Sequence, residues 1–353
     1  MKPGHPARSI LLQAKRCIRL SALATAVLTA TPLRADEFFA GKTITLMAHT
    51  APGGGYDTYL RLLARHMGRF IPGNPALIVT NKPGAGGLLA LNHAGNLAPR
   101  DGTFMTLVQQ AILLHEPMGA PGLQTSLKQL NWIGNLSQSN NLVVTWHTSP
   151  VKTIEDAMVR EATLGASGTG STAAQLPAFI NAILGTRFKI ILGYDGGTSI
   201  QIAMQRGEME GRGANTWSSY KATTPNEVRD GKYNYLIQVG LRKEVELPNV
   251  PLLSDLTRGD ILKEPISRFV SLALTVSRPL AAPPNVPADR IAILRKAFDA
   301  TMKDAAFLAE AEKLGAEIDP MEGQQVQDAV AEILSTPKDV IARIQAALGP
   351  QKR

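Results

Sequence analysis

One local design occurs three times along this chain and limits what it can fold into: an apolar run, a glycine-rich turn, and a segment with helical spacing. The turns occupy residues 51–57, 82–87 and 167–172, with the sequences APGGGYD, KPGAGG and SGTGST. Glycine permits close backbone approach and dihedral angles that other residues avoid. A strand that passes through such a turn into a helix is the building unit of α/β proteins. The sequence therefore predicts an α/β fold.

Seven short apolar runs are the candidate strands, at residues 43–48, 76–80, 104–109, 142–146, 188–193, 235–241 and 269–276. Because nearly every position in them is apolar, we expect strands covered on both faces, as in parallel sheets with crossover helices. Residues such as Leu60, Leu63 and Met67 recur at helical spacing after the first turn. The prolines between residues 279 and 287 predict a rigid connector into C-terminal helices that serve packing.

The charge of the chain is concentrated at its start. Lys and Arg number 37 against 29 Asp and Glu, which gives a formal net charge of +8. Residues 1–35 hold six of the bases and no acid, so the remaining body is close to neutral. A neutral body argues against nucleic acid as a partner.

The first 35 residues have the layout of a secretory signal peptide. Their basic start is followed by an apolar stretch at residues 20–33, which is too short for a stable membrane-spanning helix, and we expect cleavage after Ala35. A membrane anchor is the alternative. Cys17, the single cysteine, would leave with this segment, so the mature chain would contain no disulfide, thiolate metal site or cysteine nucleophile. These features predict a soluble periplasmic protein, which we expect to be a monomer.

Each glycine turn is a potential anion cradle, because the first turn of a helix carries unpaired N–H groups and a partial positive charge. A single turn of this kind often serves only chain reversal, but three at the carboxyl ends of strands would converge on a crevice. The candidate ligand-binding residues at the turns are Gly53, Gly54, Gly55, Tyr56, Asp57, Gly84, Ala85, Gly86, Gly87, Ser167, Gly168, Thr169, Gly170, Ser171 and Thr172. Asp57 either caps its helix or contacts an amine on the ligand, and Tyr56 either lines the cleft or packs within its own lobe.

Six motifs in order resemble the Bug family, the periplasmic substrate-binding proteins of tripartite tricarboxylate transporters. They are LMAHTAPGGGYD at 46–57, NKPGAGG at 81–87, APRDG at 98–102, SPVKT at 149–153, SGTGS at 167–171 and GYDGG at 193–197. The resemblance covers nearly the whole mature chain. It implies a type II periplasmic-binding-protein fold, in which two α/β lobes close on a carboxylate held by backbone N–H groups and waters at the glycine turns.

The resemblance also implies a division of the chain and a role. We expect residues 36–140 plus 249–353 to form the first lobe and residues 141–248 the second. The protein would perform no chemistry and would deliver a small organic carboxylate to the membrane permease of a tripartite transporter. A receptor that serves sensing alone is the alternative.

Several positions depart from the family pattern and leave the ligand open. His49 and Thr50 stand where members often have Pro and an aromatic residue, and Leu88 stands where a small polar residue is common. Gln175 and Leu176 occupy the region in which members often have a histidine. The segment at 207–217, GEMEGRGANTW, replaces a largely apolar strand.

Arg212 lies in that segment, at a strand position where an apolar residue would be expected. If it faces the cleft, its planar fork can bind a carboxylate with two hydrogen bonds. The alternative is an internal ion pair with Glu208, Glu210 or Asp195. Asn215 follows at the strand end, where ligands of open α/β sheets gather.

A nucleotide-dependent enzyme is the competing hypothesis. The sequence at Gly168 reads G-x-G-x-x-A, and Asp195 ends the next candidate strand, as a ribose-binding acid would. The histidines show no metal-ligand spacing, and Ser167 lacks the final glycine of a nucleophile elbow. We therefore expect no metal, no cofactor and no catalytic residue.

Overall fold

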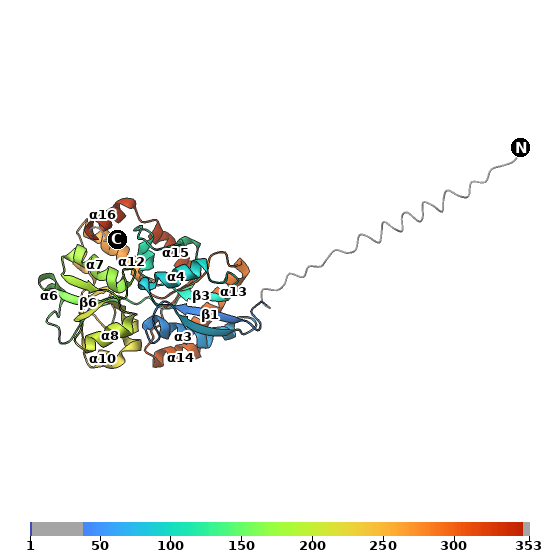
Figure 1. Ribbon diagram of the computed structural model, residues 1–353, viewed down its shortest axis with the longest axis horizontal. Coiled ribbons are helices and arrows are strands. Elements are labelled where there is room, and N and C mark those ends of the chain that lie inside the picture. Colours follow the sequence, from blue (N-terminus) through green and yellow to red (C-terminus); the bar gives the residue numbers. More distant parts are fainter. Residues whose placement is uncertain (2–37, 349–353) are drawn as a thin grey trace.

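The computed structural model describes Met1 and residues 38–348, and the predicted signal peptide lies outside the described residues. The chain forms two α/β bodies side by side (Figure 1), each built on its own sheet. We call the body on the six-stranded sheet the first lobe and the body on the five-stranded sheet the second lobe. The predicted α/β class with two lobes is confirmed.

The sheet of the first lobe has the order β11-β4-β10-β3-β1-β2. Strands β2, β1 and β3 are parallel, and β10, β4 and β11 join them through antiparallel pairs. Their bounds are β1 Thr43–Ala48, β2 Ala76–Asn81, β3 Phe104–Leu107, β4 Asn131–Asn135, β10 Pro279–Ala282 and β11 Met321–Glu322.

The sheet of the second lobe has the order β7-β6-β8-β5-β9. Here β7, β6 and β8 are parallel, while β5 pairs antiparallel with both β8 and β9. Their bounds are β5 Asn141–Trp146, β6 Ala162–Gly165, β7 Phe188–Ile191, β8 Gly211–Thr216 and β9 Tyr233–Val239.

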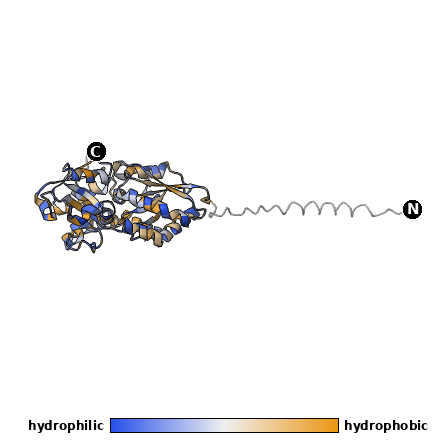
Figure 2. Cartoon of the chain, turned by 90° about the horizontal axis from the view of Figure 1, so that it is seen from below, coloured by the Kyte–Doolittle hydropathy of each residue, from blue (hydrophilic) through white to orange (hydrophobic). Residues whose placement is uncertain are grey.

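Helices connect the strands and cover both sheets. They are α3 Gly55–Met67, α4 Leu88–Asn96, α5 Ile112–His115, α6 Ile154–Val159, α7 Thr172–Leu184, α8 Gly197–Gln205, α9 Trp217–Thr223, α10 Pro225–Arg229, α11 Leu253–Thr257, α12 Lys263–Thr275, α13 Ala288–Met302, α14 Ala305–Lys313, α15 Gly323–Leu334 and α16 Lys338–Leu348. Hydrophobic and hydrophilic residues alternate along these helices (Figure 2), as amphipathic helices packed on a sheet require. None of the helices among the described residues is long and apolar enough to span a membrane.

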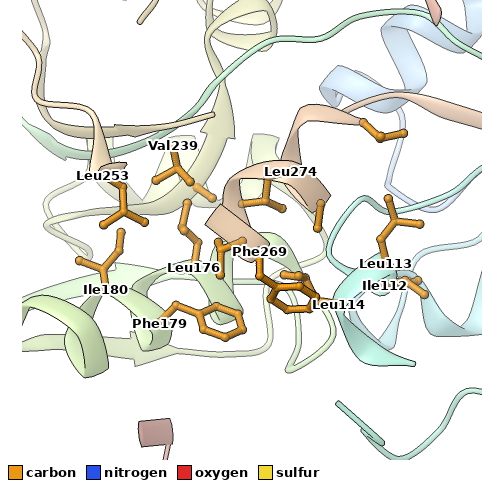
Figure 3. Packing of buried hydrophobic residues seen from close by; sticks show 14 of the residues in the cluster. Ile112, Leu113, Leu114, Leu176, Phe179, Ile180, Val239, Leu253, Phe269 and Leu274 are labelled. Atoms are coloured by element: carbon orange, nitrogen blue, oxygen red, sulfur yellow. The ribbon is translucent and has the colours of Figure 1, made fainter. Parts of the chain in front are cut away.

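Local sequence explains where α7 begins and ends. The Ser171 side chain accepts a hydrogen bond from the Ala174 N–H and caps the helix, and Gly185 ends it in the left-handed conformation at φ 75°. Leu176, Phe179, Ile180 and Ile183 are buried on one face. That face packs against Phe269 and Leu274 of α12 and against Leu253 (Figure 3).

Two sequence expectations for the C-terminal half are wrong. The run at 269–276, expected as a strand, belongs to helix α12, because Ile266, Phe269, Val270, Ala273 and Leu274 are buried at helical spacing. The connector expected from residue 279 begins instead with strand β10, which pairs with β3 and β4 in the middle of the first sheet. Both sheets are mixed and not all-parallel, and strands β4, β6, β8 and β11, like β10, were not among the seven candidate strands.

Helices α12 and α16 reach across from the C-terminal part of the chain and pack on α7 of the second lobe. Their apolar residues belong to one buried cluster that also contains Leu176 and Phe179. The lobe boundaries expected from the sequence, between residues 140 and 141 and between residues 248 and 249, stay a prediction.

Candidate functional site

A cavity of about 50 Å³, here called the inner cavity, lies between the two lobes. The first lobe contributes residues that follow β1 and β3, among them His49, Tyr56 and Gln109. The second lobe contributes residues from β8 and from the segments after β6 and β7, among them Ser171 and Arg212. These segments lie at the carboxyl ends of parallel strands, where open α/β sheets bind ligands.

Arg212 lies on β8 and faces this cavity. The residue is half-buried, and its Nε atom is buried without a hydrogen-bond partner. Its guanidinium packs on the start of α8, so closely that a Cβ on Gly197 would lie 2.6 Å from Nη2. Burial lowers the pKa of Arg212, and the charge of Arg278 lowers it further. An arginine nevertheless stays protonated in a protein, so the cavity wall carries a positive charge.

The internal acids that could have paired with Arg212 have other partners or none. Glu208 lies 3.9 Å from Arg206, and Glu210 accepts hydrogen bonds from Ser149 and Thr163. Asp195 is exposed and does not line the inner cavity. Within residues 38–348, no carboxylate lies within 4.0 Å of the Arg212 guanidinium.

Arg278, which sequence reasoning missed, also lines the inner cavity. It is 1% exposed and enters from the first lobe just before β10. Its Nη1 donates to the Ser277 carbonyl oxygen at 2.9 Å and its Nη2 donates to the Thr216 hydroxyl at 2.7 Å. The guanidinium lies 4.4 Å from the ring centre of Tyr56, a cation–π contact, and its Nε has no partner. The sequence signal that could have found it is a charged residue between an apolar run and a proline, because a charge in such a segment is rarely buried unless it is paired or functional.

Neutral polar groups complete the cavity wall. The hydroxyl of Tyr56 lies 3.2 Å from Gln109 Oε1, which also accepts a hydrogen bond from Thr172 of the second lobe at 2.8 Å. Burial, and after it the charge of Arg278, lower the pKa of His49 to about 3. His49 is therefore neutral at physiological pH. The buried Nδ2 of Asn215 has no partner and belongs to a side chain that lines the cavity.

A second cavity of about 230 Å³, here called the outer cavity, shares Gly55, Gly197 and Arg212 with the inner one. Gly53 and Gly54 of the first turn line it. Arg212 therefore stands at the boundary between the two cavities.

The carboxylate of Asp57 forms hydrogen bonds within the first lobe. Its carboxylate accepts hydrogen bonds from the Gly53 N–H at 2.9 Å, from Arg61 at 2.9 Å and from Asn81 at 2.8 Å. Burial raises its pKa, but these hydrogen bonds outweigh burial and the pKa lies below its ordinary value. Of the two roles considered for Asp57, these contacts favour the structural one.

The second and third glycine turns press against each other across the lobes. A Cβ added to Gly86 would lie 2.2 Å from the Ser171 nitrogen and 2.4 Å from the Gly170 carbonyl carbon. A Cβ on Gly168 would lie 2.8 Å from the Gly86 nitrogen. We call this backbone contact the glycine seam.

The structure brings together only part of the predicted set. Gly55, Tyr56, Ser167, Ser171, Thr172, Arg212 and Asn215 line the inner cavity, and Gly53 and Gly54 line the outer one. Gly84, Ala85, Gly86, Gly87, Gly168, Thr169, Gly170, Asp57 and Asp195 line neither cavity.

The geometry argues against the competing hypothesis of a nucleotide-dependent enzyme. A pyrophosphate would have to approach the turn at Gly168, but the backbone of Ala85 and Gly86 occupies that position. Asp195 is exposed on the surface and makes no contact with the cavity. Among the described residues, no group of three or more His, Cys, Asp or Glu side chains could hold a metal ion.

Comparison with known proteins adds sequence and fold relatives. A sequence profile described as "Tripartite tricarboxylate transporter family receptor" matches residues 60–346. A Cupriavidus necator protein, "UPF0065 protein in gbd 5'region", is 27% identical over 335 residues, which are 93% of this chain and 95% of the relative. An Agrobacterium vitis UPF0065 protein is 23% identical over 319 residues, 88% of this chain and 86% of the relative.

Solved structures share the fold. The periplasmic binding protein BugD superposes with a TM-score of 0.69 at 16% identity, over 87% of this chain and 98% of BugD. MatC from Rhodopseudomonas palustris, solved with bound malate, gives 0.68 at 17% identity, over 86% of this chain and all of MatC, 100%. An R. palustris protein solved with adipate gives 0.67 at 16% identity, over 86% and 97%.

Proposed function

Because the chain belongs to the tripartite tricarboxylate transporter receptor family, whose members are binding proteins and not enzymes, we propose that it binds a small organic carboxylate between its lobes. The bound acid lies in the inner cavity against Arg212. The protein releases it to the membrane permease of a tripartite transporter.

The observation that carries this proposal is the unpaired guanidinium of Arg212. A partly buried charge without a counter-ion is unfavourable, and proteins normally pair such groups or use them. Arg212 has no carboxylate within 4.0 Å among the described residues, and its Nε is buried without a partner. A carboxylate in the inner cavity would supply both the charge and the missing acceptor.

Hydrogen bonds between the lobes indicate how binding and closure are linked. Thr172 donates to Gln109 at 2.8 Å, Gln110 to Asn141 at 2.8 Å, and Arg278 to Thr216 at 2.7 Å. All of these groups line the inner cavity. We infer that the described conformation is the closed one, and that a hinge motion which parts the lobes opens the cavity.

Location and partners rest on the family. Residues 1–35 serve as a cleaved signal peptide, and the mature protein works in the periplasm as a monomer. The relatives solved with malate and adipate support dicarboxylates as the first ligands to test. If the protein only senses its ligand, deleting its gene will leave uptake of that ligand unchanged, whereas a transport receptor is required for uptake.

Calorimetry of the mature protein with mono-, di- and tricarboxylates tests the binding proposal. Losing one partner of a desolvated charge pair costs about 2 to 5 kcal/mol, so Arg212→Met should raise Kd by roughly 30-fold or more. Arg206→Met is the matched control, since Arg206 is exposed and outside both cavities. Unchanged affinity in Arg212→Met, or no binding of any carboxylate, would contradict the proposal.

A further inference from the structure

A third cavity, of about 110 Å³, lies between the end of α5 in the first lobe and α7 in the second, and we call it the α5–α7 cavity. It shares no lining residue with the inner or the outer cavity. The residues that line it are His115, Met118, Ala120, Pro121, Thr169, Gln175, Ala178 and Phe179. We propose that it is a second binding site, which takes a small uncharged molecule with an apolar body and one hydroxyl group. This inference does not depend on the proposed function.

The third glycine turn contributes to both this cavity and the inner one. Ser171 and Thr172 line the inner cavity, whereas Thr169 lines the α5–α7 cavity. A Cβ added to Gly170 would lie 3.5 Å from Nε2 of His115, so the histidine ring packs against the turn. The two cavities use different residues of this turn, and they can therefore be occupied separately.

The imidazole of His115 has hydrogen bonds left to make. The residue is 4% exposed, and neither ring nitrogen has a hydrogen-bond partner within the described chain. Burial lowers the pKa of His115, so at physiological pH the ring is neutral, with one N–H donor and one bare nitrogen acceptor. Buried donors and acceptors without partners are uncommon in native proteins, because each has lost its hydrogen bonds to water. A polar group on a ligand would supply a missing partner.

Gln175 adds a second group of the same kind. Its Nε2 donates to the Thr169 carbonyl oxygen at 3.4 Å, whereas its buried Oε1 has no partner among residues 38–348. A hydroxyl can donate to this oxygen or to the bare nitrogen of His115, and it can accept from the histidine N–H. One hydroxyl is therefore the smallest group that suits either side chain and either tautomer of the ring.

The rest of the wall indicates an apolar and uncharged ligand. None of the described residues that line the cavity is Asp, Glu, Lys or Arg. The neighbouring acid, Glu116, accepts hydrogen bonds from the Ser126 hydroxyl at 2.6 Å and from the Leu127 N–H at 2.7 Å. A charged ligand would lose its water here without gaining a counter-ion. The apolar part of the wall consists of Met118, Ala120, Pro121, Ala178 and Phe179.

Hydrogen bonds hold this wall in place. The Ala120 N–H donates to the His115 carbonyl oxygen at 2.9 Å, and Gln345 of α16 donates to the Met118 carbonyl oxygen at 2.7 Å. The volume of about 110 Å³ approaches the roughly 150 Å³ of an engineered apolar cavity that binds benzene. Pro121 and Thr169 line the cavity and are exposed, so a ring can enter from solvent and extend toward it.

Phenol is the probe, since it combines one ring with one hydroxyl and is uncharged at neutral pH. In mature protein with ¹³C-labelled methionine methyl groups, phenol should shift the NMR signal of Met118 in a saturable way, because a bound ring acts on nearby methyl groups. Met47 packs with Ala90 and Phe104 and lines none of the three cavities, so its signal should not move.

Toluene has the shape of phenol but no hydroxyl, and it tests the polar groups. A double variant with His115→Leu and Gln175→Met removes the unpartnered atoms and keeps side chains of similar size. The affinity for phenol relative to toluene should fall by at least about fivefold from wild type to this variant, which corresponds to one lost hydrogen bond. Taking the ratio cancels the difference in hydrophobicity between the two probes.

Filling the cavity locates the probe. Ala178→Phe places a ring in the cavity and should abolish the saturable shift of Met118. Ala182→Phe makes the same change one turn later on α7, at a partly exposed position outside the cavity, and should keep the shift. If Ala178→Phe does not fold, the double variant decides.

Three outcomes would overturn this inference: no saturable shift of Met118 with phenol, undiminished phenol binding in a folded Ala178→Phe protein, or an unchanged ratio of phenol to toluene affinity in the double variant. Each would leave the carboxylate proposal standing, because that proposal is measured with other ligands and at Arg212.

Discussion

The first glycine turn and the other two have similar sequences, but the structure uses them differently. Gly53 and Gly54 border the outer cavity, and a Cβ added to either would lie 3.3 Å or more from its nearest neighbour, whereas a Cβ on Gly55 would lie 2.0 Å from the Ser219 hydroxyl oxygen of the second lobe. Gly86, Gly168 and Gly170 have the backbone of the opposite lobe against them. A glycine-rich turn thus predicts that something approaches the backbone closely, but not whether that is a ligand or another part of the same chain.

The largest effect that this comparison predicts is at the glycine seam. Gly86→Ala places a Cβ 2.2 Å from the Ser171 nitrogen, and this contact is with backbone that cannot move aside easily. The lobes should fail to close, and ligand affinity should fall by about two orders of magnitude or more, because several interlobe hydrogen bonds of about 1 kcal/mol each are lost. Calorimetry and scattering of the ligand-bound variant measure both effects.

Gly231→Ala is the matched control for that variant. Gly231 has φ 62° and Gly86 has φ 65°, but a Cβ on Gly231 meets nothing within 4 Å. Both variants should lose about 1 to 2 kcal/mol of unfolding free energy through the left-handed backbone, and only Gly86→Ala should lose binding. Normal binding by Gly86→Ala would mean that the seam is absent from the ligand-bound state.

A smaller effect is expected at Asp57, which holds the first turn in shape. Asp57→Asn removes the charge at the helix start and weakens the bonds to Gly53 and Arg61, so unfolding free energy should fall by about 1 to 2 kcal/mol. Ligand affinity should change by less than about threefold, since Asp57 does not line either cavity. A loss of binding without a loss of stability would instead assign Asp57 to the ligand.

The same carboxylate gives a dependence on pH. The pKa of Asp57 is lower in the folded protein than its ordinary value of about 3.9, so its ionised form stabilises the fold above that value. This contribution should be lost as the pH falls from the ordinary carboxyl range through the lower folded pKa. Denaturant unfolding of wild type and Asp57→Asn should therefore differ at pH 7 and converge below that range.

The smallest effect is expected at Gly54. Its φ is −77°, and the nearest atom to an added Cβ is the Thr50 hydroxyl oxygen at 3.3 Å. Gly54→Ala should change the unfolding free energy by less than about 0.5 kcal/mol, as substitutions outside tight sites do. If the ligand contacts this part of the backbone directly, affinity will fall although stability does not, and the first turn is then part of the ligand cradle.

Local patterns predicted six of the eleven strands, namely β1, β2, β3, β5, β7 and β9. Strand β1 occupies the predicted residues 43–48, and β2 extends the predicted run 76–80 by one residue. The run at 269–276 was wrong because a continuous apolar stretch fits a buried strand and a buried helix equally, and only packing on α7 and α15 decides. A strand could therefore be predicted where the local pattern was enough, and the prediction was wrong at 269–276, where contacts with other helices decide between strand and helix.

The candidate site also shows that local sequence patterns do not predict contacts between distant parts of the chain. Arg212 stood out because a charge replaced an apolar residue within a strand pattern. Arg278 gave a weaker signal, since its burial depends on Thr216, Tyr56 and Tyr59, which come from distant parts of the chain. The glycine seam likewise joins two turns that a single sequence gives no reason to pair.

The packing of α12 and α16 on α7 has a mechanical consequence. That contact between the lobes is apolar, with Phe179, Leu176 and Ile180 against Phe269 and Leu274 (Figure 3), and parting it would expose hydrophobic surface to water. The contact near α9 is polar, because Lys221 reaches Glu317 at 3.6 Å and both side chains are partly exposed. Such an ion pair contributes little and separates readily.

The molecule should therefore open by a hinge motion, with the apolar contact at the hinge and the polar contact at the edge that parts. The lobes would swing about the side where α7, α12 and α16 lie, and the largest displacements would occur at the opposite edges, near α3, α14, α8 and α10 (Figure 1). A membrane partner that distinguishes the loaded from the empty receptor would detect the difference most readily at those edges.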